Sequence, residues 1–184
     1  MPLTTPVERE HLHSRDVKCQ GFRRRDGLWD IEAHLIDTKT FTFPNRDRGG
    51  VIAAGEPLHG MSLRVTLDLD FVIHGIEAVT DYSPFTICVN ASTAMKRLVG
   101  LKIAPNWLDE VRRRIGKTEG CTHLIELLRP MASTAYQTMH FAREEREDQK
   151  TVRSRPRIID TCHALASNGP IVKLEWPDFY TGED

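Results

Sequence analysis

The stretch Met61-Ser62-Leu63-Arg64-Val65-Thr66-Leu67-Asp68-Leu69-Asp70 alternates apolar and polar residues at every step. Because successive side chains of a strand point to opposite faces of a sheet, this pattern predicts a strand with one buried face. A turn near Asp70 leads into a second apolar run over residues 72–80, and the two runs together predict an antiparallel hairpin. Residues 28–37 alternate in the same way, which predicts a third strand.

Downstream of these strands the apolar period lengthens to that of a helix. Three helices are expected, the first after Asn90, the second from Pro105 and the third near Cys121. Pro130 is expected to kink or split the third helix, because proline lacks an N–H donor and clashes with the preceding turn. Strands followed by helices predict an α+β fold, in which helices pack on one face of a small antiparallel sheet.

The length of 184 residues fits a single domain over residues 1–184. Residues 1–19 are polar and irregular, which predicts an N-terminal arm, and residues 20–142 hold the expected core. Residues 143–157 are interpreted as a charged helix end and a linker. Residues 158–184 are expected to return to the core as a C-terminal segment that packs back on it.

The charge balance argues against two classes of partner. The 25 Lys and Arg residues nearly match the 26 Asp and Glu residues, so no overall field attracts nucleic acid or an anionic membrane. No apolar stretch is long enough to span a bilayer, and the start Met1-Pro2-Leu3-Thr4 does not resemble a secretion signal. We therefore expect a cytoplasmic protein with a small-molecule substrate. Both a monomer and a homo-oligomer are compatible with the sequence.

Cysteine and histidine occur side by side in two motifs, Gly120-Cys121-Thr122-His123 and Asp160-Thr161-Cys162-His163. Thiolate with imidazole is a donor set that zinc and iron accept, and it is also the pairing of a nucleophilic thiol with its base. His59 precedes the clearest strand and Cys88 precedes a helix, so both stand at element ends. The candidate metal ligands are His59, Cys88, Cys121, His123 and Cys162, and the alternative is that these side chains merely pack.

Candidate catalytic groups come from a different pattern. Asp30, Glu32 and His34 point to one face of the strand over residues 28–37, where they would form a general acid–base row. The alternative is that they are the wet face of an antiparallel sheet. The predicted catalytic set is His59 with Asp30 and Glu32.

Three short motifs, in order, match a known family. They are Pro57-Leu58-His59-Gly60-Met61, the run from Cys88 to Met95, and Gly120-Cys121-Thr122-His123-Leu124. On these motifs residues 56–137 resemble the iron–sulfur scaffold proteins of NifU/IscU type, although His59 replaces the first cysteine and Met61 replaces an aspartate. The resemblance implies a NifU/IscU-like core with extensions at both ends, and a zinc or iron–sulfur carrier.

Over most of its length the chain is similar to an uncharacterised bacterial family, a domain of unknown function. The matching motifs are Arg24-Arg25-Asp26-Gly27-Leu28-Trp29-Asp30-Ile31-Glu32, Gly55-Glu56-Pro57-Leu58-His59, Gly120-Cys121-Thr122-His123-Leu124 and Asp160-Thr161-Cys162-His163-Ala164. This resemblance implies no settled activity. It associates the protein with the catabolism of aromatic compounds, including lignin-derived dimers.

Three functions follow as expectations. The first is a small enzyme acting on a small organic or aromatic compound, for instance a retro-aldol lyase that releases formaldehyde, with His59 as base and with Trp29 and Trp107 in an apolar pocket. A zinc or iron ion would polarise the departing oxygen in such an enzyme. The second is the zinc or iron–sulfur carrier, and the third is a non-catalytic structural or regulatory domain.

Overall fold

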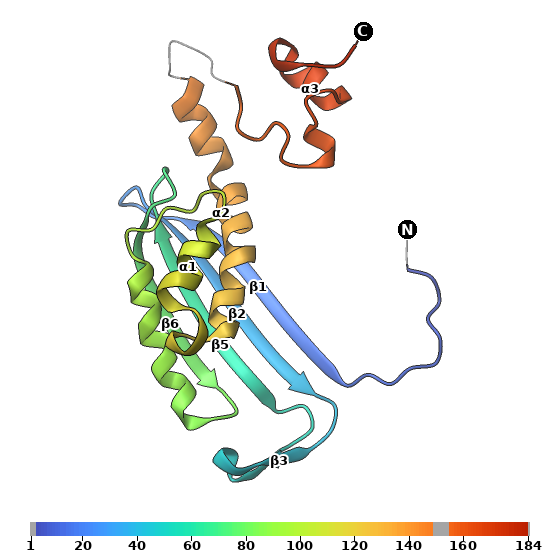
Figure 1. The fold of residues 1–184 in the computed structure, drawn as a ribbon, viewed down its shortest axis with the longest axis vertical. Helices are drawn as coiled ribbons and strands as arrows, with labels where there is room; N and C mark the ends of the chain where they lie inside the picture. Colours follow the sequence, from blue (N-terminus) through green and yellow to red (C-terminus); the bar gives the residue numbers. More distant parts are fainter. Residues whose placement is uncertain (1–2, 149–154, 184) are drawn as a thin grey trace. The chain divides into compact units, whose positions relative to one another are not determined.

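The computed structural model describes residues 3–148 and 155–183 (Figure 1). By its internal contacts the chain forms two compact units, Met1–Ala142 and Arg143–Asp184, and each is described by itself. Within the described parts, no helix combines the length and the apolar character that crossing a membrane requires.

The first unit is built on a four-stranded antiparallel sheet, and the predicted α+β class is confirmed. The strand order is β1 (His13–Arg23), β2 (Trp29–Lys39), β5 (Pro57–Leu67), β6 (Ile73–Tyr82). The connection from β2 to β5 carries a separate small hairpin, formed by β3 (Phe43–Asn45), η1 (Arg46–Arg48) and β4 (Gly50–Ile52). The hairpin predicted from residues 61–70 and 72–80 is the β5–β6 pair.

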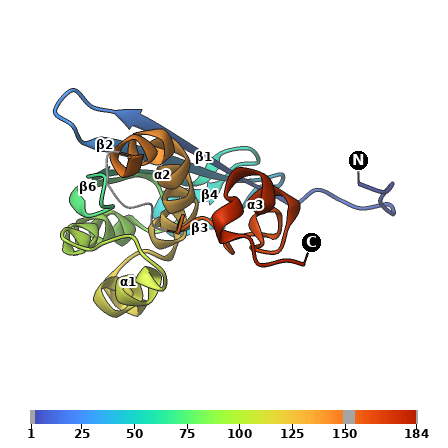
Figure 2. The same ribbon diagram turned by 90° about the horizontal axis from the view of Figure 1, so that it is seen from above.

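Helices cover one face of this sheet (Figures 1 and 2). They are η2 (Thr86–Leu98, a 3₁₀ helix), α1 (Trp107–Ile115), η3 (Lys117–Glu119, a 3₁₀ turn) and α2 (Thr122–Asp148). The first begins four residues before the predicted start at Asn90. The predicted split at Pro130 is wrong, because α2 continues through it, and a kink there stays a prediction.

The core explains why α2 tolerates its proline. The odd-numbered residues 29–37 of β2 and 61–67 of β5 are buried beneath the helices, and α2 contributes Leu124, Leu127, Leu128 and Met131, each at most 2 % exposed. Burying each such side chain stabilises the fold by about 1.5–3 kcal/mol, which together exceeds the ~3 kcal/mol that proline costs inside a helix.

The N-terminal arm is shorter than predicted, because β1 begins at His13 and pairs along its whole length with β2. This strand lies at the edge of the sheet and has no clean apolar alternation, so backbone pairing rather than side-chain pattern defines it. It packs closely against α2 at Gly21, where a Cβ atom would lie 1.8 Å from Thr138 Oγ1. Residues 13–19 are therefore part of the sheet and lie beside β2.

The β3–β4 hairpin is attached to the segment that follows β6. The Asn45 side chain donates to the carbonyl oxygen of Pro84 over 3.0 Å, and Asp47 accepts from the backbone N–H of Thr86 over 3.1 Å. Arg48 donates to the carbonyl oxygen of Pro57 over 3.2 Å. These bonds hold the connection beside the first residues of β5.

The second unit contains η4 (His163–Leu165), α3 (Pro170–Glu175) and η5 (Pro177–Phe179). Its described residues are held by local bonds, such as the one from the Ser167 N–H to Asp160 Oδ1 over 2.7 Å. The packing of residues 158–184 against the core stays a prediction, and part of the predicted linker, residues 149–154, lies outside the described residues.

Candidate functional site

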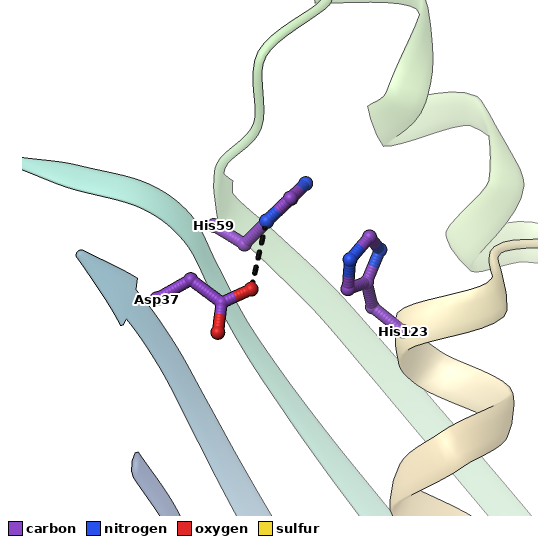
Figure 3. Close-up of side chains that lie close together, drawn as sticks. All are labelled: Asp37, His59 and His123. Atoms are coloured by element: carbon purple, nitrogen blue, oxygen red, sulfur yellow. Dashed lines mark hydrogen bonds and ion pairs between the residues drawn. The ribbon is translucent and has the colours of Figure 1, made fainter. Parts of the chain in front are cut away.

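Asp37, His59 and His123 form a cluster on the helix-covered side of the sheet (Figure 3). Asp37 lies near the end of β2 directly opposite His59 on β5, and His123 lies in the first turn of α2. One ligand atom from each side chain lies within 4.8 Å of the other two. A search of residues 3–148 and 155–183 for three or more His, Cys, Asp or Glu side chains spaced closely enough to share a metal ion gives this cluster.

The carboxylate of Asp37 is 1 % exposed and fully engaged. Arg15 donates from Nε to Oδ1 over 2.7 Å and from Nη2 to Oδ2 over 2.8 Å, and His59 donates from Nδ1 to Oδ2 over 2.9 Å. Burial opposes ionisation, but the hydrogen bonds and charges of Arg15 and His59 outweigh it and hold the pKa of Asp37 below its ordinary value. Asp37 is therefore a buried anion with a bidentate cationic partner.

The imidazole of His59 is 12 % exposed, and its protonation state follows from its surroundings. Burial and the neighbouring His123 lower its pKa, whereas Asp37 acts in the opposite direction without reversing the shift. Because a carboxylate only accepts hydrogen bonds, Nδ1 of His59 carries the proton. The lone pair is then on Nε2, and His59 is the neutral base of an Asp–His pair.

His123 lies against His59, with ring centroids 3.8 Å apart and planes inclined by 33°. Burial lowers the pKa of His123, and the positive charge of Arg15 lowers it further. Two sulfur atoms are nearby, because Cys121 Sγ lies 3.8 Å from His123 Nδ1 and 4.0 Å from Met61 Sδ. The site therefore combines two neutral imidazoles with a thiol and a thioether.

Arg15 connects three elements at this point. It binds Asp37 on β2 and also donates from Nη1 to Glu126 Oε2 on α2 over 2.6 Å. The hydrogen bonds and charges of these carboxylates raise the pKa of Arg15 despite its partial burial. The guanidinium is thus a permanent cation that fixes the edge strand to the site.

The structure separates the predicted catalytic residues. Asp30 and Glu32 point to the open face of the sheet, opposite to the face of His59, because β2 alternates. Asp30 accepts a hydrogen bond from Thr66 Oγ1 over 2.6 Å, and Glu32 accepts one from Arg64 Nε over 2.8 Å. The structure therefore does not bring Asp30 and Glu32 together with His59, and both lie on the open face, as the alternative has it.

The predicted metal ligands are only partly brought together. His123 lies against the ring of His59 and 3.8 Å from Cys121 Sγ, but Cys121 is not part of the metal-spaced group. Cys88 lies half-buried in η2 and is not part of the metal-spaced group, whereas Cys162 is an exposed residue of the second unit, directly before η4.

Two hollows occur elsewhere on the first unit, and His59 lines neither. A hollow of about 370 Å³ lies on the open face, among Lys18, Gln20, Glu32, His34, Ser62 and Arg64. A smaller one of about 180 Å³ includes Trp107 and Arg129. Trp29 is 7 % exposed within the core and lines neither hollow, so the expected pocket of Trp29 and Trp107 stays a prediction.

Sequence reasoning missed Asp37 and Arg15. The sequence did contain a signal for Asp37, because this residue continues the alternating series that points to the buried face of its strand. A carboxylate on a buried face needs a charged or hydrogen-bonding partner. Arg15 gave no comparable signal, since its strand lacks an apolar pattern.

The comparisons with known proteins assign no chemistry to this cluster. No curated protein and no solved structure matches the chain. One family model matches residues 13–137, which contain all of the cluster and its arginine. The chain therefore belongs to the family described as a protein of unknown function, DUF2889.

Proposed function

We propose that the protein is an enzyme that acts on a small hydroxylated organic compound, with His59 as the general base. The observation that carries this proposal is the hydrogen bond from His59 Nδ1 to the buried, Arg15-paired Asp37. An anionic partner fixes the tautomer and the orientation of the ring, and it stabilises the imidazolium that forms on proton uptake. His123, stacked on this ring, is the second acid–base group.

The reaction proposed is a retro-aldol cleavage that releases formaldehyde. Nε2 of His59 removes the proton of a hydroxymethyl group, the C–O bond becomes a carbonyl, and the neighbouring C–C bond breaks. The electron pair stays on the substrate carbon, which must carry a carbonyl or another acceptor, and that carbon then takes a proton back from an imidazolium. The step needs no oxidant or reductant.

The charges around His59 favour a neutral substrate. The single guanidinium of Arg15 already pairs with two carboxylates, those of Asp37 and Glu126. Each of its three nitrogens donates to one of these carboxylates, so Arg15 itself is not free to bind an anionic group. A hydroxylated aromatic compound fits this balance, and the aromatic part of the proposal rests on the family resemblance.

The second candidate, a zinc or iron carrier, is favoured by the spacing of Asp37, His59 and His123. However, both carboxylate oxygens of Asp37 already accept hydrogen bonds from Arg15, so an ion bound by Asp37 would have to displace a guanidinium. This competition favours acid–base chemistry at the three residues. The iron–sulfur scaffold version rests on the NifU/IscU resemblance alone.

Formaldehyde release from a panel of aromatic compounds with hydroxymethyl groups tests the proposal. His59→Asn is expected to lower kcat/KM by about 10²–10⁴-fold, the usual contribution of a general base. His34→Asn is the matched control, because this histidine is on the same sheet but faces the open side and binds Ser62. Full activity in His59→Asn, or no turnover of any panel member by the parent, would contradict the proposal.

A chelator added to the same assay separates the two candidates. Acid–base catalysis by His59 predicts unchanged turnover after chelation. A loss that added zinc or iron restores would favour the metal-dependent alternative.

A further inference from the structure

The thiol of Cys121, next to the histidine pair, lies close to two other soft or borderline donor atoms. Cys121 Sγ lies 3.8 Å from His123 Nδ1 and 4.0 Å from Met61 Sδ. Donors that bind one ion through bonds of about 2.0–2.3 Å are separated from one another by about 3.3–4.0 Å in tetrahedral or trigonal geometry. Both separations have this size without any rearrangement.

We propose that Cys121, Met61 and His123 form a binding site for one soft monovalent cation, Cu(I). Thiolate and thioether ligands select Cu(I) among biological metals, and a site with two sulfurs and one imidazole matches that preference. The thioether is the distinguishing ligand, because zinc is bound by thiolate, imidazole and carboxylate.

The fold holds these donors in place from two elements. Met61 occupies an inward position of β5 and is 1 % exposed, so its thioether is fixed by the core. Cys121 directly precedes α2, and its carbonyl oxygen accepts the N–H of Ile125 over 3.0 Å. Cys121 and His123 are both half-buried, which leaves them a route to solvent. An ion can therefore reach donors that the core has already oriented.

Charge balance favours a monovalent ion. One thiolate neutralises Cu(I), whereas a divalent ion would leave an extra positive charge near Arg15, whose field already acts on His123. The site is thus better suited to a singly charged soft ion than to Zn²⁺.

The proposal shares His123 with the proposed enzyme but is tested independently of it. It uses no atom of His59 or Asp37 as a ligand, and it is measured by metal binding rather than by turnover. Loss of formaldehyde release would leave it intact, and loss of copper binding would leave the acid–base proposal intact.

The test uses the full chain with Cys19, Cys88 and Cys162 all changed to serine, so that Cys121 is the remaining thiol. The protein competes for Cu(I) with a chromophoric chelator under anaerobic, reducing conditions. We expect one tightly held Cu(I) per chain, with X-ray absorption showing two sulfur ligands and one nitrogen ligand. Zn²⁺ in parallel titrations should bind more weakly.

Single substitutions in this background identify the ligands. Met61→Leu should weaken Cu(I) binding by at least about tenfold, and Cys121→Ser should abolish it. Met95→Leu is the matched control, because Met95 is equally buried but belongs to η2, and its binding should equal that of the parent. Unaltered binding in Met61→Leu, or copper with a single sulfur ligand in the parent, would overturn the proposal. The spectrum of the parent decides the matter if Met61→Leu fails to fold.

Discussion

The two faces of the sheet carry the same kinds of side chain with different consequences. On the open face Glu32 pairs with Arg64, and the side chains are 40 % and 48 % exposed. On the helix-covered face Asp37 pairs with Arg15, and the carboxylate is 1 % exposed. Water solvates the first pair whether or not it forms, whereas the second carboxylate depends on its partner. Burial beneath the helices, rather than residue type, therefore distinguishes Asp37, which belongs to the candidate site, from Glu32, which does not.

Removal of the arginine from each pair should give the largest difference between the faces. Arg15→Met leaves the Asp37 carboxylate buried without its cation, and we expect a loss of about 3 kcal/mol in the free energy of unfolding. Arg64→Met, the matched variant on the open face, should cost at most ~1 kcal/mol. Urea unfolding curves measure both, and equal losses would show that burial does not distinguish the pairs.

Glycine substitutions compare the packing of the two faces. Gly21→Ala places a Cβ 1.8 Å from Thr138 Oγ1 on α2, so strand and helix must separate, at a cost of about 1–3 kcal/mol. Gly75→Ala on the open face meets nothing closer than Thr66 at 3.6 Å and should change stability by less than ~0.5 kcal/mol. Thermal melts are the measurement, and a harmless Gly21→Ala would contradict the close packing of β1 on α2.

Acid should weaken the covered face in two stages. The pKa values of His59 and His123 are lowered in the folded protein, so the unfolded chain binds protons first as the pH falls below the ordinary histidine value of about 6.5. Stability should therefore decrease from pH 7 towards pH 5. The pKa of Asp37 is also lowered, so its contribution is present above about pH 4 and is lost as the pH falls through its folded value.

Urea midpoints measured across this pH range check these signs. Asp37→Asn should remove the lower stage, and a double variant His59→Asn/His123→Asn should flatten the upper one. A parent protein that gains stability between pH 7 and pH 5 would contradict the lowered histidine pKa values.

The smallest effect is expected for Glu32→Gln. It removes one charge of an exposed pair on the open face, so stability should change by less than ~0.5 kcal/mol and any turnover that depends on His59 should be unchanged. Parallel measurements of unfolding and formaldehyde release test this. A clear loss of turnover would bring the open face back as a catalytic surface.

The sequence predicted the sheet well where one face is buried. Alternation in residues 61–70 and 28–37 identified the two central strands, because the core imposes a strict period of two on them. Edge strand β1 was missed over residues 13–19, since most of its side chains are exposed and carry no such period. Continuation of α2 through Pro130 could not be predicted either, because core packing overrides the local cost of proline.

The candidate site was predicted in part. His59, Cys121 and His123 were selected because cysteine and histidine at element ends suggest chemistry, and the fold places both His59 and Cys121 beside His123. Their partners Asp37 and Met61 occupy ordinary strand positions, so only the strand register shows that they face the same place. Pairings that depend on register and helix placement are tertiary facts, which local patterns do not contain.

The long connection between β2 and β5 has a consequence for protein engineering. Asp37 and His59 face each other through strand register, while the β3–β4 hairpin between them is bonded to the segment at Pro84 and Thr86. Variation in chain length and composition at the hairpin tip leaves the paired strands as they are. A library of grafted tips that keeps Asn45, Asp47 and Arg48 would therefore vary this connection and preserve the ionic centre.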